Sequence, residues 1–193
     1  GTLSFIRADE VGAMDISFQV LMPGFDYDLA HAGKGPSYGW MFFTSYNTEQ
    51  AHTLLEVNAS QNDKDFIAAV NWLRAEECIE AGAGRMMNSP YYHNFDHGDR
   101  IGRATLKESV KVIEPADCEG IVYFLPTPKS PHGVDVDPSG QYIVAGGKLA
   151  TVIPVHSFDK MIAAIESEAF EGEVDGIPVL QYDAVIAGEV TNP

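Results

Sequence analysis

The chain has 193 residues and is strongly acidic, with 12 Lys and Arg against 28 Asp and Glu and a formal net charge of −16. An acidic surface repels phosphate groups, so the composition argues against a protein that binds nucleic acid or an anionic membrane. No apolar stretch is long enough to span a membrane, no signal-peptide pattern is visible, and neither Gly1 nor Pro193 resembles a natural terminus, so we expect an internal fragment of a longer protein.

The first half of the chain contains three expected strands and one expected helix. Residues 15–20 alternate between polar and apolar, which is the period of a strand with one buried face, and Pro23-Gly24 ends this run. Residues 38–45 and 66–72 are rich in aromatic and apolar side chains, which favours two strands within a sheet. The segment LRAEECIEAG (73–82) then predicts a short helix that Gly82 caps.

The two cysteines, Cys78 and Cys118, are far apart in the sequence and have no spacing typical of metal ligands. They can be two buried thiols or, in an oxidising compartment, one disulfide. The position of Cys78 within the expected helix favours two buried thiols.

The second half of the chain begins with residues 84–100, which show no periodicity and are expected to form a loop. Pro154 indicates an edge strand or a bulged strand, and Asp159 is expected to be the N-cap of a helix over KMIAAIESEAF (160–170). The expected strands are residues 110–113, 121–125, 141–145, 151–158 and 178–187.

A weak internal repeat is visible. FIAAVNWLRAEE (66–77) and TVIPVHSFDKMI (151–162) both pass from an apolar strand through a polar joint into a short helix. Many short strands with weak repetition predict an all-β fold, either a sandwich or a propeller, and composition does not separate the two.

The segment KSPHGVDVDPSGQYIVAGGK (129–148) holds the most informative histidine. His132 lies in a Pro-His-Gly corner that we expect just before a pair of strands, and Asp137-Pro138-Ser139-Gly140 has the residues of a tight turn between them. Gly146-Gly147 is expected to end the second strand. A corner of this kind restricts the histidine as metal ligation requires, although a solvent-facing turn histidine has the same local pattern.

Three segments together resemble nitrous-oxide reductase: YGWMFFTSYNTEQ (38–50), the SPHG corner (130–133) and GGKLATVIPVHSFDKM (146–161). The resemblance is to the catalytic propeller of the branch exported through the general secretory route. It runs over the whole chain, is strongest at residues 38–72 and 123–161, and is weakest at residues 82–101. It implies that residues 1–193 form an internal part of an all-β domain, a partial seven-bladed β-propeller with short helical and loop insertions.

The resemblance also implies copper. The family's catalytic centre is a four-copper sulfide cluster (CuZ) held by histidines from different blades, and His132 matches one ligand position. No catalytic residue beyond this ligand is expected, and because the other ligands would lie outside this chain, the isolated fragment should be inactive. A His93–His97 pair can bind a stray metal, but its flanking residues favour a solvated turn. The histidines that match no ligand position are His31, His52, His93, His97 and His156.

A calcium site is implied as well, because the family places calcium near the cluster. The matching positions are Tyr46, Glu49, Ala59, Asp65 and Ser130, with Asn58 as an alternative to Ala59. Calcium prefers carboxylate and carbonyl oxygens, which these residues can supply. Without the resemblance, the residues Asp63-Lys64-Asp65 read as a solvated turn.

The activity implied is the reduction of nitrous oxide to dinitrogen and water, the last step of denitrification, in the periplasm. The implied partners are nitrous oxide, a small electron-donor protein such as a c-type cytochrome, and a second copy in a head-to-tail homodimer. The resemblance implies that the cupredoxin domain with its binuclear copper centre (CuA) belongs to the parent protein, and we expect it to be absent from this chain. Two other functions remain open: a non-catalytic β-propeller that acts as a binding scaffold, and a calcium-dependent propeller hydrolase such as a lactonase, with Glu49 and Asp65 on the metal.

Overall fold

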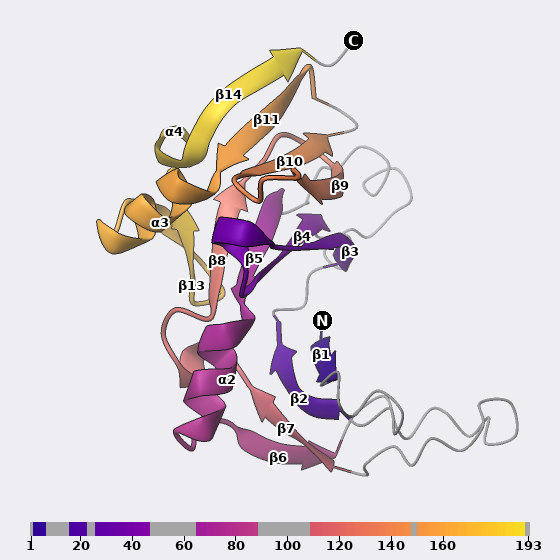
Figure 1. The fold of residues 1–193 in the computed structure, drawn as a ribbon, viewed down its shortest axis with the longest axis vertical. Helices are drawn as coiled ribbons and strands as arrows, with labels where there is room; N and C mark the ends of the chain where they lie inside the picture. Colours follow the sequence, from indigo (N-terminus) through magenta and orange to yellow (C-terminus); the bar gives the residue numbers. More distant parts are fainter. Residues whose placement is uncertain are drawn as a thin grey trace, which may run out of the picture. The chain divides into compact units, whose positions relative to one another are not determined.

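The computed structural model describes residues 2–6, 16–22, 26–46, 65–88, 109–147 and 150–191 (Figure 1). The chain divides into two units. Unit 1 contains Pro23–Arg74 and Gly120–Pro193, and unit 2 contains Thr2–Met22 and Ala75–Glu119. None of the helices in the described part of the chain is long and apolar enough to cross a membrane.

Unit 1 holds two sheets, of which the first has six strands in the order β12-β13-β8-β5-β4-β3. Its neighbours are antiparallel except for β13 and β8, which are parallel and bring Val179 opposite Phe124. The short helix η1 (Gly35–Ser37) connects two of these strands. The strands are β3 (Asp26–Ala32), β4 (Trp40–Tyr46), β5 (Phe66–Asn71), β8 (Val122–Pro126), β12 (Phe170–Val174) and β13 (Ile177–Leu180).

The second sheet of unit 1 is antiparallel throughout, with four strands in the order β14-β11-β10-β9. Two helices are part of the same stretch of chain: α3 (Phe158–Glu166) follows β11, and α4 (Tyr182–Val185) precedes β14. The strands are β9 (Pro131–Val136), β10 (Tyr142–Gly147), β11 (Val152–Ser157) and β14 (Ile186–Thr191).

One apolar core joins the two sheets of unit 1 to the helices α3 and α4. Alternate residues of β4, β5, β8, β9 and β10 point into it, as the period of two along a strand requires. Its fully buried members include Phe42, Ile67 and Leu125 from the first sheet, Ile143 and Ala145 from the second, Met161 from α3 and Val185 from α4.

Unit 2 contains a four-stranded sheet in the order β1-β2-β7-β6 and most of α2 (Trp72–Glu80). The helix ends where expected, because Gly82 adopts a φ of +99° and Ala83 N–H donates to Cys78 O over 2.9 Å. The strands are β1 (Thr2–Ile6), β2 (Ile16–Leu21), β6 (Arg85–Asn88) and β7 (Ser109–Ile113).

Cys78 and Cys118 form a disulfide in unit 2, with their Cα atoms 6.3 Å apart. The preference for two buried thiols is therefore wrong. The disulfide joins α2 to the end of the short helix η3 (Pro115–Asp117), so the hairpin β6–β7 between these helices is closed into a covalent loop. A loop of this length stabilises the folded chain by about 4 kcal/mol in the chain-entropy account.

The chain repeats one succession of elements. Three antiparallel strands are followed by a helix, a hairpin, a second short helix and a fourth strand, first as β3-β4-β5-α2-β6-β7-η3-β8 and then as β9-β10-β11-α3-β12-β13-α4-β14. We call these the first repeat and the second repeat. The weak echo between residues 66–77 and 151–162 is therefore confirmed, because it marks the third strand and the helix of each repeat.

The hairpin of each repeat pairs with a strand that precedes that repeat. β13 runs parallel to β8, the fourth strand of the first repeat, and β7 runs parallel to β2 in the same way. β1 and β2 are antiparallel neighbours, as β5 and β8 are, so they hold the places of a third and a fourth strand. β2 and β8 are thus each paired by a hairpin from a later part of the chain.

The expected all-β fold is confirmed, and the strands expected at 15–20, 38–45, 66–72, 110–113, 121–125 and 141–145 are all present within a few residues. The partial seven-bladed propeller stays a prediction, since packed antiparallel sheets occur in other all-β folds too. It agrees with the repeated succession of elements.

Several local expectations are wrong. Residues 178–187 form the end of β13, the helix α4 and the start of β14, because Gln181 interrupts the strand. Of the expected loop, residues 85–88 form β6, Gly84 lies outside any strand, and residues 89–100 lie outside the described part of the chain. Ser157, rather than Asp159, is the N-cap of α3, since its hydroxyl accepts Lys160 N–H over 3.4 Å, and the helix ends at Glu166.

The strands around His132 also differ from expectation. His132 lies inside β9, and Gly146-Gly147 lies inside β10, because the two segments pair with one another. Pro154 lies in β11, a central strand between β10 and β14, so the edge-strand alternative is wrong. A bulge does occur where β11 pairs with β14, between Val155 and His156.

Candidate functional site

His132 is the extra residue of a β-bulge. Gly133 pairs with Gly146 and Pro131 pairs with Gly147, which leaves His132 without a partner across the ladder. A bulge turns the side chain of the unpaired residue away from its regular direction. His132 is therefore directed outward, with 53% of its side chain exposed, between the buried residues Pro131 and Val134.

A second bulge lies opposite the first one. In β3, Tyr27 pairs with Ser45 and Ala30 pairs with Phe43, so Asp28 and Leu29 together face Thr44. The carboxylate Oδ2 of Asp28 lies 3.3 Å from Nε2 of His132. The two bulges thus bring an imidazole from the second sheet to a carboxylate from the first sheet.

The backbone beside His132 is held in place by two close contacts. The hydroxyl of Thr44, which is fully buried, donates to His132 O over 3.4 Å. On the opposite strand, a Cβ on Gly147 would lie 2.5 Å from Lys129 O and 3.0 Å from Pro128 O. The segment that leads into the bulge can therefore lie against β10 only because residue 147 is glycine.

The predicted calcium residues Asp65 and Ser130 are also in contact. Ser130 N–H donates to Oδ1 of Asp65 over 3.0 Å, and the backbone oxygen of Asp65 accepts Thr127 N–H over 3.0 Å. Ser130 is buried and has a φ of +59°, in the left-handed region that non-glycine residues rarely adopt. A strained residue of this kind beside a carboxylate is typical of a functional site.

Tyr46 is brought to the same end of the first sheet. Ser45 pairs with Phe66, and Tyr46 and Asp65 are the next residues along these two segments. Three of the five predicted calcium positions therefore lie toward the same end of the first sheet. The other predicted positions, Glu49 and Ala59 with its alternative Asn58, lie outside the described residues.

The described residues can supply one ligand of a metal centre, His132, rather than a whole centre. With Nε2 taken by Asp28, Nδ1 of His132 is the ring nitrogen that remains to bind a metal, and a carboxylate on the other nitrogen is the usual support for a ligating histidine. Within the described residues, no three His, Cys, Asp or Glu side chains are grouped so as to hold a metal ion. The residues present fit a site that is completed by other ligands.

A second histidine–carboxylate pair lies on the same two strands. Nδ1 of His31, on β3, is 3.1 Å from Oδ1 of Asp135, on β9. The Asp135 side chain is 87% exposed, so water screens this pair and it contributes little to stability. His156 does not join the site, because it is buried in the core, and His52, His93 and His97 lie outside the described residues.

Asp28 is the site residue that sequence reasoning missed. Its role depends on bulges in β3 and in β9, and a bulge is a property of the pairing between two strands, which neither strand's own sequence reveals. Asp28 is also more than one hundred positions from His132 in the chain.

The turn between β9 and β10 fixes the other end of the strand that carries His132. The carboxylate of Asp137 accepts the N–H groups of Ser139, Gln141 and Tyr142 over 2.9–3.0 Å. The bond from Tyr142 N–H is the largest of the causes that lower the pKa of Asp137 to about 2. The expected Asp137–Gly140 turn is confirmed.

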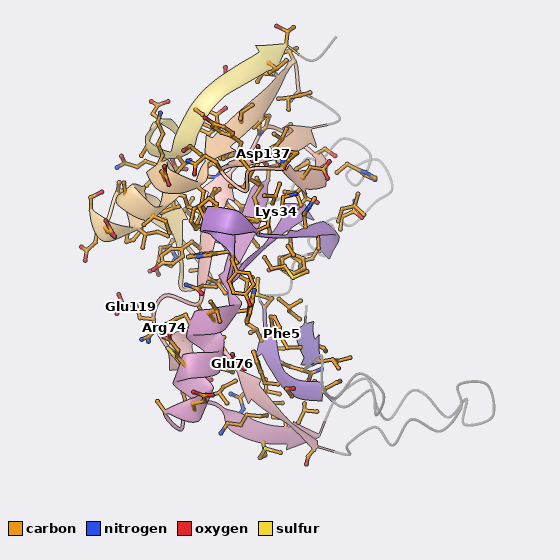
Figure 2. The ribbon with its side chains drawn as sticks, viewed as in Figure 1. Phe5, Lys34, Arg74, Glu76, Glu119 and Asp137 are labelled. Atoms are coloured by element: carbon orange, nitrogen blue, oxygen red, sulfur yellow. A yellow bond between two sulfur atoms is a disulfide. The ribbon has the colours of Figure 1, made fainter. Side chains whose placement is uncertain are left out.

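This turn lies against the loop that contains Lys34, which follows β3 (Figure 2). A Cβ on Gly140 would clash with Lys34 O, and one on Gly35 would lie 2.8 Å from Ser139 O. Both glycines have a positive φ. The strands β3 and β9 are therefore fixed to one another by their loops as well as by the Asp28–His132 pair.

Two known proteins resemble the chain at low identity. No protein-family model matches the chain. It is 26% identical over 162 residues to a nitrous-oxide reductase from Pseudomonas fluorescens, a match that covers 83% of this chain and 22% of that protein. It is 22% identical over 155 residues to a nitrous-oxide reductase from Stutzerimonas stutzeri, which covers 80% of this chain and 21% of that protein. The chain thus spans about a fifth of the length of these curated relatives, and it is similar to an oxidoreductase at low identity over most of its own length.

Proposed function

We propose that this chain is part of a copper-dependent reductase that converts nitrous oxide to dinitrogen and water, and that His132 is one ligand of its four-copper sulfide cluster. The observation that carries the proposal is the presentation of His132, from the SPHG motif, on a bulge with its Nε2 held by Asp28. The similarity to nitrous-oxide reductases over about four fifths of the chain supports the same reading.

The chain's own contribution would be to position the His132 ring for copper. Imidazole binds copper well, and the orientation of its ring is set by the partner of the second nitrogen. Asp28 would hold the ring in one orientation, while Thr44 and Gly147 keep the backbone of the bulge in place. The bound cluster would supply the redox chemistry, for which no protein side chain is suited.

A calcium ion beside this site is part of the proposal. Asp65 would contribute a carboxylate oxygen, and Tyr46 and Ser130 would contribute backbone carbonyl oxygens, with Glu49 and Ala59 completing the set. Calcium takes six to eight such oxygens. The hydrogen bond from Ser130 N–H to Asp65 supports this grouping, because it holds the two residues together before any ion binds.

The compartment and partners follow from the same proposal. A disulfide between Cys78 and Cys118 is consistent with the periplasm, since disulfides persist in oxidising compartments. The intact protein would receive electrons from a small donor such as a c-type cytochrome, through a binuclear copper centre on a separate cupredoxin domain. In a head-to-tail homodimer, that centre would serve the partner's cluster.

The test is copper content and nitrous-oxide turnover of the intact protein that contains these residues, purified without oxygen. We expect His132→Ala to lose cluster copper, its visible absorption and turnover together. Asp28→Asn should lower copper affinity or activity by about 10- to 100-fold, which is the usual effect of removing a ligand's supporting carboxylate.

His31→Gln is the matched control, because His31 lies on the same strand as Asp28 and pairs with a different carboxylate. It should keep both copper and turnover. An intact protein without copper, or a His132→Ala variant that keeps copper and turnover, would refute the proposal and favour a non-catalytic binding scaffold.

A further inference from the structure

The fourth strands of the two repeats, β8 and β14, each have an outer edge, and so does β2, which holds the place of a fourth strand. Two of these three edges are covered. β8 is paired on its outer side by β13, and β2 is paired by β7. Both covering strands are parallel to the strand that they cover, and both belong to a hairpin from a later part of the chain.

β14 holds the same place in the second repeat, and within the described residues its only strand partner is β11. Figure 1 shows it as the last strand of its sheet. The three fourth strands differ in burial accordingly. The central residues of β2 and nearly all of β8 are buried, whereas no residue of β14 is buried and Val190 is 55% exposed.

The equivalence of β8 and β14 can be stated residue by residue. Ala68 precedes the first residue of α2 by four positions, as Pro154 precedes the first residue of α3. Ala68 pairs with Phe124, and Pro154 pairs with Glu189. Phe124 is the residue that meets Val179 of the covering hairpin, so Glu189 is where a covering strand would be centred on β14.

We infer that the outer edge of β14 binds a β-hairpin from a further repeat of this same plan, with the inner strand of the hairpin parallel to β14. The unpaired N–H and C=O groups of an edge strand are a template for strand addition. The small residues Ala187 and Gly188 leave room for a close approach.

The hairpins already present define the chemistry of the occupant. The inner strand β13 reads Ile-Pro-Val-Leu, with three of its four residues buried, and β7 alternates buried and half-buried positions. The outer strand β12 reads Phe-Glu-Gly-Glu-Val and has an exposed centre. The occupant of β14 therefore has a short apolar inner strand and a polar outer strand. This inference does not depend on the copper proposal.

The test supplies such a hairpin to the chain itself. A second copy of residues 169–181, which contain β12 and β13, is appended after residue 193 through a Gly/Ser linker of about eight residues. In the expected order, the outer strand follows β14 and the inner strand returns between the two, so the linker has to span about 10 Å. A flexible linker of this length has a root-mean-square span of about 15 Å, and it raises the local concentration of the hairpin to the millimolar range.

Hydrogen exchange of the β14 amides is the measurement, with sedimentation to establish that the chain is monomeric. We expect exchange of the outward-facing amides of β14 to slow by at least about tenfold in the extended chain. A matched extension with proline in place of the second Val179 should leave the exchange unchanged, because proline at the central position of the inner strand has no N–H to donate to a neighbouring strand.

Two results would overturn the inference. One is equally fast exchange with and without the appended hairpin. The other is slow exchange of β14 in the unextended chain that depends on protein concentration, because the edge would then be covered by a second copy of this chain. Neither result bears on copper content, so failure here is distinguishable from failure of the proposed function.

Discussion

At the scale of single residues, His156 connects the two sheets of unit 1. It lies in β11, is fully buried, and its Nε2 is 3.0 Å from Pro126 O at the end of β8. Its ring also packs edge-on against Tyr182 of α4. Burial is the main cause that lowers the pKa of His156 to about 4, and the hydrogen bond to Pro126 offsets part of this effect.

This histidine predicts an acid-sensitive fold. The unfolded chain binds a proton at His156 below about pH 6.5, while the folded chain resists protonation down to about pH 4. Stability that is fully present above pH 6.5 should therefore fall as the pH drops to 4, by about 3 kcal/mol from this one group. Urea unfolding from pH 8 to pH 4 should show this loss in the native chain.

The matched variant is His156→Gln, whose amide can still donate to Pro126 O but does not titrate. Its stability should change less between pH 6.5 and pH 4. Parallel pH profiles for the two chains would contradict the prediction. Asp137 affects stability over a separate and lower pH range. Because its pKa is depressed in the folded chain, its contribution to stability is lost only as the pH falls from about 3.8 toward 2.

The candidate site could be predicted only in part at this scale. SPHG and Tyr-Asn-Thr-Glu are local motifs, so His132 and Tyr46 could be identified from the sequence. Asp28 could not, because its contact with His132 is made by two bulges in strands of different sheets. The sequence shows which residues can bind a metal, whereas the register between strands decides which of them meet.

At the scale of elements, β10 contains a matched pair of glycines beside the site. A Cβ on Gly147 would meet Lys129 O and Pro128 O, whereas a Cβ on Gly146 would meet nothing within 4 Å. We expect Gly147→Ala to lower the free energy of unfolding by about 1–3 kcal/mol, as overpacking does, and to displace the segment that leads to His132.

Gly146→Ala is the control, and it should change stability by less than about 0.5 kcal/mol. Urea unfolding of both variants measures the difference, and histidine resonances report on the position of the His132 ring. Equal stability of the two variants would show that residues 128–129 move aside easily and do not fix the bulge.

The elements themselves differ in how far the sequence predicts them. The helix α2, its Gly82 cap and the strands β5 and β8 follow from local patterns. The hairpin β12–β13 and the break before β14 were missed, because Phe170–Val174 has glutamates and a glycine where a strand former is expected. That strand is stabilised by pairing with β13, and tertiary pairing of this kind overrides intrinsic preference.

At the scale of the whole molecule, calcium should stabilise the fold. A ligand that binds only the folded chain adds about 2.7 kcal/mol at one hundred times its Kd. For a chain of this size we therefore expect millimolar Ca²⁺ to raise the Tm by about 5–10 °C. Mg²⁺ at the same concentration should act more weakly, because it demands a smaller octahedral site.

Asp65→Asn should abolish the calcium-dependent shift while its amide oxygen still accepts Ser130 N–H. Asp175→Asn removes the same charge from the exposed turn between β12 and β13, so it should keep the shift. Calorimetric scans with Ca²⁺ and with a chelator make the comparison. A shift that survives in Asp65→Asn would place any bound calcium elsewhere.

The all-β class of the whole molecule could be predicted from its many short strands, and the internal repeat from a faint echo in the sequence. The coverage of one repeat's last strand by a hairpin of the next repeat could not, because it is a pairing between segments far apart in the chain. A pattern within one segment carries no information about such partners.

The same hairpin coverage determines how long the edges of β2 and β8 remain unpaired while the chain is being synthesised. Phe124 of β8 pairs with Val179, which is added about 55 residues later, and Gln19 of β2 pairs with Val112, which is added about 93 residues later. At ~5–20 residues per second, these edges stay open for roughly 3 to 20 s during synthesis. A pause in translation just before either hairpin would therefore lengthen the period in which a nascent chain can pair with its neighbours instead of with itself.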